Sequence, residues 1–348
     1  MKKLLGLLLA LMVLLCGCTA WQTASVQQDA PAKKQYTATF LTLFDTVTTI
    51  VGRADSEAEF QQRAQAVHDE LEVYHRLFDI YNDYEGVPNL KTVNENAGAA
   101  PVKVDGEILD LLKDCKTYYD LTDGRVNVAM GSVLNLWHEA RTEGINDPAN
   151  AALPSGDALE EAAAHVRMDA LILDEANSTV FLSDAGARLD VGAIAKGWSV
   201  QRVCENAPAG LLISVGGNVC ATGPKDEQGS AWVVGVQNPD MGQDYLHTLY
   251  LTKGSVVTSG DYQRGYLVNG IYYHHIIDPD TLYPSTYWRS VTVVCPDSGV
   301  ADALSTALFV LSQEEGQALL DKTDAKAMWL DGAGNRFYSP GFEDLIRT

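Results

Sequence analysis

The chain has 348 residues, 46% of them hydrophobic, and a formal net charge of −21. This length and composition suffice for a full apolar core, which excludes disorder as the default state. The negative charge excludes a general electrostatic footprint for nucleic acid, and it favours cationic ligands or a metal ion that bridges to anionic ones.

The N-terminal segment is separate from the body of the chain. Two lysines precede a short apolar run that ends in Leu15-Cys16-Gly17-Cys18, the pattern of a secretory signal. The run resembles a bacterial lipoprotein signal, which would span residues 1–17 and leave Cys18 as the lipidated first residue; an ordinary signal peptide is the alternative. Residues 18–35 lack apolar periodicity and are expected to form a flexible tether. We therefore expect a protein with a lipid anchor on the extracytoplasmic face of a cell membrane.

Four cysteines remain outside the signal, and none forms a CxxC pair. Their scattered positions in apolar segments predict buried thiols, with two disulfide bridges as the alternative for an exported protein. They are Cys115, Cys204, Cys220 and Cys295.

The first half of the body reads as strands followed by helices. Thr, Val, Phe and Ile fill residues 36–51, which predicts one long strand or two consecutive ones. Apolar side chains at helical spacing predict helices over 56–78 and 105–119, and Asp123-Gly124 ends the second helix. The polar segment 78–96 between them is long for a structureless loop and is expected to line a site.

Residues 127–137 form a mixed run, and the polar residues 139–154 are expected to form a surface segment. A helix is predicted over 155–166. The strands expected next are 171–173, 180–182, 188–190, 211–215, 232–237, 246–251 and 255–257, with the last four continuing one sheet.

Three turns along this sheet offer backbone or side-chain groups to a ligand. The junction 190–198 combines small residues, a helix N-terminus and Lys196, which suits an anion; its spacing is not that of a P-loop. Close strand–helix packing with a solvated lysine is the alternative. The other two turns are Gly216-Gly217-Asn218, where the backbone can approach closely, and Thr258-Ser259-Gly260, which supplies hydroxyls.

Residues 264–277 predict a β-hairpin, because Asn269-Gly270 separates two β-rich runs. A two-residue turn places Arg264 opposite His275 and turns His274 to the other face. The cation opposite His275 should disfavour its imidazolium and leave the ring neutral, able to accept a proton.

The C-terminal part predicts a strand at 291–295, a helix at 301–311, a last helix capped by Ser312 and Glu315, and a closing hairpin. Asp302 and Thr306 are four residues apart, so both face one side of the helix, where a carboxylate and a hydroxyl suit Mg²⁺. The alternative is a dipole partner and an incidental threonine. With no repeat or internal linker, residues 36–348 are expected to form one α+β domain of two lobes.

These motifs together resemble the ApbE-type flavin transferases, FAD:protein FMN transferases that are often exported lipoproteins. The order and spacing of residues 190–198, 215–218, 258–261, 275–284 and 301–311 carry the resemblance, which covers 36–340. It implies a T-fold-like body with a mainly antiparallel sheet, FAD in an elongated pocket between two lobes, and Mg²⁺. It also implies transfer of FMN to a threonine hydroxyl of a partner protein, with release of AMP.

The resemblance also assigns roles to residues. Mg²⁺ would be held by Asp302, Thr306 and a main-chain oxygen of the Gly192-Ala193 turn, and Lys196 would contact the diphosphate. The FAD pocket would be lined by Gly216, Gly217, Asn218, Thr258, Ser259 and Gly260. His275, with Asp278 beside it, would act as base or positioning group for the threonine. The aromatic side chains that could stack on FAD are Tyr74, Tyr81, Trp137 and Tyr283.

Two positions depart from the family pattern. Leu282 stands where an HxxDPxTG motif commonly has glycine, and Phe44-Asp45-Thr46 replaces the usual Met-Gly-Thr. The alternative functions are an FAD pyrophosphatase that gives FMN and AMP, and a non-catalytic FAD-binding lipoprotein.

Overall fold

The computed structural model describes residues 33–240 and 245–348. The predicted signal, Cys18 and nearly all of the tether lie outside the described residues. Lys34 and Gln35, which the sequence assigned to the tether, already belong to strand β1 (Lys34–Leu43). No helix in the described ranges is long and apolar enough to cross a membrane.

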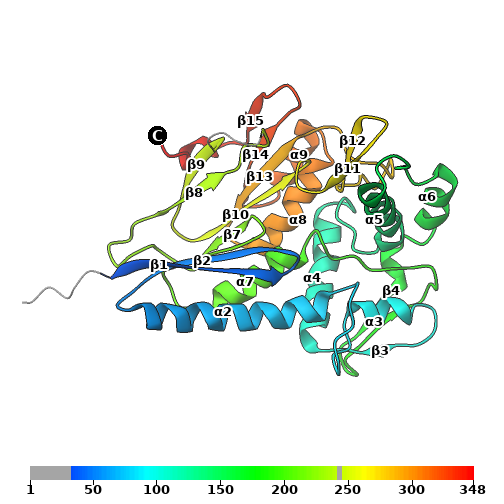
Figure 1. The fold of residues 1–348 in the computed structure, drawn as a ribbon, viewed down its shortest axis with the longest axis horizontal. Coiled ribbons are helices and arrows are strands. Elements are labelled where there is room, and N and C mark those ends of the chain that lie inside the picture. Colours follow the sequence, from blue (N-terminus) through cyan, green and yellow to red (C-terminus); the bar gives the residue numbers. More distant parts are fainter. Residues whose placement is uncertain (1–32, 241–244) are drawn as a thin grey trace, which may run out of the picture. The chain divides into compact units, whose positions relative to one another are not determined.

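An eight-stranded sheet organises the chain from Lys34 onward (Figure 1). Its spatial order is β1-β2-β6-β7-β10-β13-β14-β15, and each neighbouring pair is antiparallel. After β1 its strands are β2 (Thr46–Ala54), β6 (Leu211–Val215), β7 (Asn218–Ala221), β10 (Gly254–Gly260), β13 (Ser290–Cys295), β14 (Lys326–Leu330) and β15 (Arg336–Tyr338). The predicted α+β class with a mainly antiparallel sheet is confirmed.

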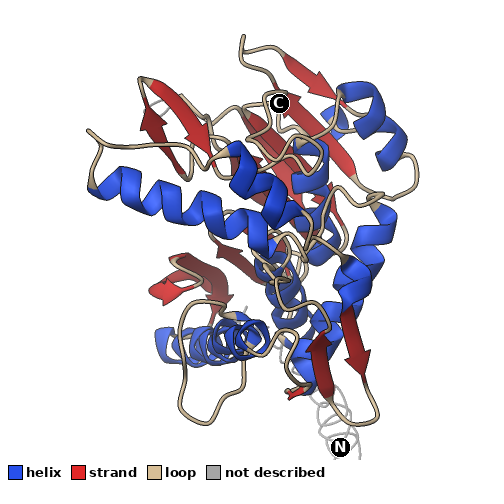
Figure 2. Ribbon diagram, turned by 90° about the vertical axis from the view of Figure 1, so that its right-hand side faces the viewer, coloured by secondary structure: helices blue, strands red, loops and turns tan. Residues whose placement is uncertain are grey.

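Three helices cover one face of this sheet, α2 (Glu57–Phe78), α7 (Ala195–Asn206) and α8 (Ser298–Phe309). Figure 1 shows α2 running along β1 and β2, and Figure 2 shows the helices beside the strands. Each helix buries an apolar stripe in the main core, and α8 is apolar nearly all round because it lies between the sheet and α7. Ser56 and Asp297 cap α2 and α8.

The opposite face carries a separate two-stranded sheet, β8 (Trp232–Val236) and β9 (His247–Leu251). The prediction that these strands continue the main sheet is wrong. Val234 and Leu249 are buried against a second apolar cluster, whereas their neighbours Val233 and Tyr250 are exposed. That alternation is typical of a strand pair that packs on a sheet, with one face buried and the other exposed to solvent.

The remaining elements lie in two places. A mostly helical group beside the sheet consists of α3 (Leu90–Glu95), α4 (Gly106–Leu121), α5 (Gly131–Asn146), α6 (Gly156–Ala163), the 3₁₀ turn Met168–Ala170 and the sheet β3-β5-β4 (Val102–Lys103, Thr179–Leu182, Leu171–Asp174). Helix α9 (Gln313–Leu320) packs against α8 and β14, and the 3₁₀ turn Glu343–Leu345 packs against β9. The sequence predicted a surface segment from residue 139, but residues up to Asn146 belong to helix α5. This helix buries only a thin stripe of side chains, which includes Val133 and Trp137. The strand expected at 188–190 is reduced to one bridge between Met130 and Arg188.

The predicted hairpin is present as β11 (Gly265–Val268) and β12 (Ile271–His274). Its register is the expected one, with Val268 opposite Ile271 and Tyr266 opposite Tyr273. Asn269 and Gly270 both have positive φ, 51° and 81°, as a type I′ turn requires. Tyr266 and Val268 bury the inner face of the hairpin in a cluster with Trp137 of α5.

Replacing Gly270 with alanine should destabilise the protein by about 1–2 kcal/mol, because a Cβ there would be forced into the left-handed region. Nothing lies within 4 Å of the added Cβ, so strain is the only cost. Gly106→Ala is the matched control: its surroundings are equally open, its φ is ordinary, and it should change stability by less than about 1 kcal/mol, in the stabilising direction. Urea unfolding measures both. Equal stabilities would contradict the turn assignment.

Candidate active site

A cavity of about 840 Å³ opens between the sheet and the helical group. Leaving the candidate stacking aromatics aside, its wall contains every site residue predicted from the sequence within the described ranges except Asp278. These residues are Ala193, Lys196, Gly216, Gly217, Asn218, Thr258, Ser259, Gly260, His275, Asp302 and Thr306. The volume lies in the upper part of the range for small-molecule sites, so an elongated ligand has room.

One end of the cavity is built by the close approach of α7 and α8. The Oδ2 atom of Asp302 accepts a hydrogen bond from the N–H of Gly197 at 2.8 Å. The Nζ atom of Lys196 lies 3.7 Å from the same oxygen and donates to the carbonyl of Gly192 at 3.1 Å. Burial raises the pKa of Asp302, and Lys196 opposes that rise. This end therefore holds a buried carboxyl group that a nearby cation and hydrogen bonds stabilise as an anion.

Asn218 adds a hydrogen-bond donor at the same end. Its side chain is 2% exposed and lies near enough to Asp302 to lower the pKa of that carboxyl group, yet its Nδ2 atom has no hydrogen-bond partner of good geometry among the described residues. A buried amide donor without a partner costs free energy. Since Asn218 lines the cavity, a ligand oxygen is the natural acceptor for this donor.

In the other two turns, 216–218 and 258–260, the chain packs closely against neighbouring strands and helix α8. Gly216 and Gly217 have φ of 57° and 93°, and a Cβ on Gly216 would meet Thr46 at 2.7 Å. The hydroxyls of Thr258 and Ser259 are hydrogen-bonded to Thr292 and Ser305. These hydroxyls fix β10 to β13 and α8, so each retains only part of its hydrogen-bonding capacity for a ligand.

His275 is half-buried in the cavity wall, where protein atoms surround the ring except on the cavity side. Its Nδ1 atom lies 3.1 Å from the carbonyl oxygen of Arg264, which can only accept, so Nδ1 carries the proton. Burial, and then the charge of Arg264, lower the pKa of His275 to about 3. The predicted neutral ring is confirmed, with Nε2 as the acceptor, although burial contributes more than the cation does.

His274 has a structural arrangement, as its place on the other face of the hairpin predicts. Its Nε2 atom hydrogen-bonds to the carbonyl of Ser285 at 2.7 Å, and its Nδ1 atom accepts from the N–H of Ile276 at 3.1 Å. Both ring nitrogens are thus committed to the backbone, which leaves neither for a ligand.

Asp278 is not where its predicted catalytic role requires. Its carboxylate accepts from the N–H of Asp280 at 2.9 Å, and its carbonyl accepts from the N–H of Leu282 at 2.8 Å. This Asx-type turn holds the loop after His275, and Asp278 is not among the residues that line the cavity. Leu282 has a φ of 63°, the left-handed conformation that glycine would adopt without strain.

Two of the four candidate aromatic residues line the cavity, Tyr81 and Trp137. Tyr74 packs edge-on against Trp198 in the core, and Tyr283 packs against Trp137 from outside the lining. Tyr81 is stacked on His138 at 4.8 Å, and burial raises the pKa of Tyr81 to about 12.

The lining also includes residues that sequence reasoning missed. His138 and Arg141 lie on α5, Arg141 within the segment 139–154 that was expected to be surface, and Tyr262 follows β10. The signal that could have found the first two was their position one and four residues after the buried Trp137, which places them on or beside the inner stripe of a helix. Phe44 and Asp45 form the β1–β2 turn with φ of 52° and 51°, and both line the cavity.

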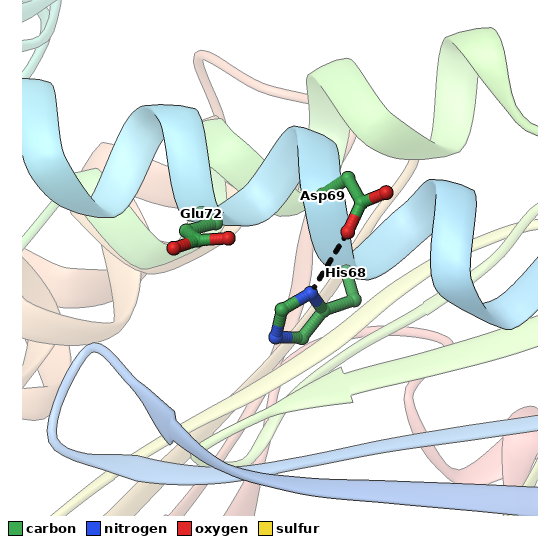
Figure 3. Close-up of side chains that lie close together, drawn as sticks. All are labelled: His68, Asp69 and Glu72. Carbon is green, nitrogen blue, oxygen red and sulfur yellow. Dashed lines mark hydrogen bonds and ion pairs between the residues drawn. The ribbon is translucent and has the colours of Figure 1, made fainter.

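One other cluster in the described part of the chain has metal-ligand chemistry, His68, Asp69 and Glu72 of α2 (Figure 3). His68 Nδ1 lies 3.2 Å from Asp69, and the His68 ring packs on Phe40 at 4.5 Å. None of the three lines the cavity. His68 is therefore a partly buried histidine of helix α2 that packs on strand β1.

The fold and the cavity are those of an α+β enzyme with a polar site between a sheet and a helical group. The ApbE family model matches residues 44–329. The FAD:protein FMN transferase of Treponema pallidum is 37% identical over 66% of this chain and 67% of its own length. That of Klebsiella pneumoniae is 32% identical over 76% and 83%. The crystal structure of the ApbE protein from Thermotoga maritima superimposes with a TM-score of 0.80 at 29% identity, covering 90% of this chain and 100% of that one. The chain therefore belongs to the ApbE family and is a transferase.

His275 should remain neutral in the folded protein from pH 8 down to about pH 4, because its pKa is lowered to about 3. As the pH falls from about 6.5 toward 3, the unfolded chain gains a proton at this ring and the native chain does not. The contribution of His275 to the stability of the native state is therefore fully present above pH 6.5, and the free energy of unfolding decreases as the pH falls below that value. NMR titration of the ring protons, assigned with His275→Gln, measures it. A midpoint near 6.5 would refute the neutral site.

Gly197→Ala should separate α7 from α8, because its Cβ would lie 2.3 Å from the carbonyl oxygen of Ser298 and 2.4 Å from Cβ of Asp302. We expect a loss of about 1–3 kcal/mol in urea unfolding. Gly332→Ala, which has open surroundings, is the control and should be close to neutral. Equal stability of the two variants would show that the helices can part without cost.

Proposed function

We propose that the protein transfers FMN from FAD to a threonine hydroxyl of an acceptor protein and releases AMP, with Mg²⁺ bound at Asp302. The observation that carries the proposal is the composition of one cavity: a buried carboxylate with a lysine and an unpartnered amide donor, and a neutral histidine in the same wall. The names of the relatives from Treponema and Klebsiella support the same reaction.

The donors at the α7–α8 end fit Mg²⁺. Asp302 and Thr306 offer a carboxylate and a hydroxyl from one helix face, and Ala193 brings main-chain oxygen to the same cavity. All are hard oxygen ligands, which Mg²⁺ prefers, and they are few enough for it to keep water and take phosphate oxygens. When bound, the ion would neutralise charge on the diphosphate and on the departing AMP.

The protein's own groups would share the remaining work. Lys196, the Nδ2 of Asn218 and the N-terminus of α7 can bind phosphate oxygens. In the transfer a bond forms between the threonine oxygen and the FMN phosphorus, while the bond from that phosphorus to the AMP oxygen breaks. The Nε2 atom of His275 would accept the hydroxyl proton. A bound diphosphate would raise the pKa of His275 from its low value, since a nearby anion favours the imidazolium.

The N-terminal pattern supports an extracytoplasmic site of action. Cys18 would carry the lipid that anchors the enzyme, and residues 19–33 would tether the body near the membrane. The acceptor would then be a membrane or exported protein that presents its threonine on the same side. FAD pyrophosphatase activity is the second candidate, because water can replace the threonine in the same geometry.

The direct test incubates the full-length protein in detergent with FAD, Mg²⁺ and a peptide containing Asp-Gly-Ala-Thr. Mass spectrometry should show a peptide heavier by one FMN unit, and chromatography an equal amount of AMP. AMP and free FMN without a heavier peptide would establish the pyrophosphatase instead. FAD binding without release of AMP would indicate a non-catalytic FAD-binding protein.

His275→Ala should lower the rate of transfer by about 10²–10⁴-fold, the usual contribution of a proton acceptor, while FAD affinity changes little. His68→Ala is the matched control, because that histidine lies outside the cavity and should leave the rate unchanged. Initial rates and FAD fluorescence quenching measure the two quantities. Full activity in His275→Ala would remove this residue from the mechanism.

A further inference from the structure

The hairpin β11–β12 exposes three large apolar side chains beside the cavity. Leu267, Ile271 and Tyr272 are 57%, 59% and 44% exposed. Leu267 and Tyr272 lie directly opposite each other in the ladder, so their side chains are neighbours on one face, and Ile271 adds to them at the hairpin tip. These three residues form the apolar hairpin surface.

A glycine shapes this surface. Gly265 lies on the same face of the hairpin as Tyr272, and a Cβ on Gly265 would lie 2.4 Å from Cζ of that tyrosine. Because the glycine has no side chain, the tyrosine ring can lie across the ladder instead of standing away from it. The ring and Leu267 therefore present a continuous apolar area to solvent.

The same face continues into the cavity. Side chains two residues apart on a strand share a face, so His274 lies on the face that carries Tyr272 and Leu267. His274 lines the cavity and packs edge-on against Phe309 of α8, with 5.6 Å between the ring centroids. The face thus runs from solvent at Leu267 to the cavity wall, and β12 leads directly to His275. Helix α5 packs on the opposite face of the hairpin.

This continuity distinguishes the apolar hairpin surface from a similar exposed pair elsewhere. Val233 and Tyr250 lie opposite each other on β8 and β9, and both are exposed. No residue of β8 or β9 lines the cavity. An exposed apolar patch can mark a protein-binding site, and only the patch on β11–β12 adjoins the place where the reaction would occur.

The composition of the hairpin suits a protein partner. No Asp, Glu, Lys or Arg occurs from residue 265 to residue 274, although the chain carries 46 acidic and 25 basic residues. The centres of protein–protein interfaces are poor in charged residues and rich in tyrosine. Leu267, Ile271 and Tyr272 lie outside the cavity lining, so FAD in the cavity would leave them uncovered. The other reactant of an FAD:protein FMN transferase is a protein.

We infer that the apolar hairpin surface docks the acceptor protein through apolar side chains close in sequence to the threonine that receives FMN. The inference rests on the proposed function and names the kind of contact that holds its acceptor. Tyr272 precedes His275 by three residues, a span of about 10 Å along a strand. An extended acceptor with its threonine at His275 would therefore place residues about three to five positions away over the surface.

The experiment compares two peptides on the FAD-loaded, full-length protein in detergent, Val-Leu-Asp-Gly-Ala-Thr-Gly-Ser-Leu-Val and Ser-Ser-Asp-Gly-Ala-Thr-Gly-Ser-Ser-Ser. They carry apolar or polar residues at the expected distances on both sides of the threonine. Fluorescence anisotropy of labelled peptides gives affinity without requiring transfer, and kcat/KM for transfer is measured in parallel. The wild type should prefer the apolar peptide by about tenfold in both, since apolar area is buried on binding.

Leu267→Ser/Tyr272→Ser should reduce that ratio to near one, and retained FAD binding would show that the cavity is intact. Tyr272→Phe keeps the ring and should keep the preference. Val233→Ser/Tyr250→Ser is the matched control, because it removes a similarly exposed cross-strand pair from strands that do not line the cavity. This control should keep the full preference.

Equal affinity of the wild type for both peptides would overturn the inference. So would loss of the preference in the Val233→Ser/Tyr250→Ser control, because the peptides would then bind exposed apolar side chains in general. Absence of transfer to either peptide, with the binding preference intact, would instead overturn the proposed function and leave the docking surface standing.

Hydrogen exchange of the amides of residues 265–274 tests the other possible occupants. The amides should gain protection when the apolar peptide is added. Protection that appears without peptide as the protein concentration is raised would assign the surface to a second copy of the chain. Protection that appears without peptide on phosphatidylglycerol vesicles would assign it to the membrane. Either result would overturn the inference.

Discussion

The contact between α7 and α8 is the constraint on which the rest of the site depends. Gly197 lets the two helices meet closely enough for its N–H to hold the carboxylate of Asp302, which is 4% exposed. A buried carboxylate is costly unless hydrogen bonds and a cation compensate it, and this contact supplies the first while Lys196 supplies the second. The same packing aligns the first turn of α7 with the cavity, so the proposed anion site and the proposed metal site both depend on one helix crossing.

The antiparallel sheet carries this crossing on one face, and the hairpin that follows β10 packs against α5. Strand β10 ends at Thr258–Gly260 in the cavity wall, and β11 begins five residues later with Arg264 just before it. Both His274 and His275 line the cavity, but they differ in the ring nitrogens that the backbone engages. His275 keeps Nε2 free because Nδ1 is bound to the backbone, whereas His274 has both nitrogens committed. The neutral proton acceptor in the cavity wall thus depends on one two-residue turn.

Local chemistry made much of this predictable from the sequence. Asn269-Gly270 determined the hairpin and its register, Ser56 and Asp297 cap helices of the expected length, and Asp302 with Thr306 follow from helical spacing. What failed depended on tertiary contacts. Asp278 looked catalytic beside His275, but its carboxylate folds back on the backbone of its own turn. His138 and Arg141 were missed because α5 buries so few apolar residues that its periodicity is faint, and β8 and β9 were misplaced because alternation does not say which sheet a strand joins.

A crystal structure of the complex with FAD and Mn²⁺ in place of Mg²⁺ would test the central claim most directly, through the anomalous signal of the metal. The account predicts a peak about 2.1 Å from a carboxylate oxygen of Asp302, in contact with the diphosphate and on the same side of the cavity as Lys196. A peak at His68, Asp69 and Glu72 of α2, or an FAD whose diphosphate lies away from α7, would contradict it.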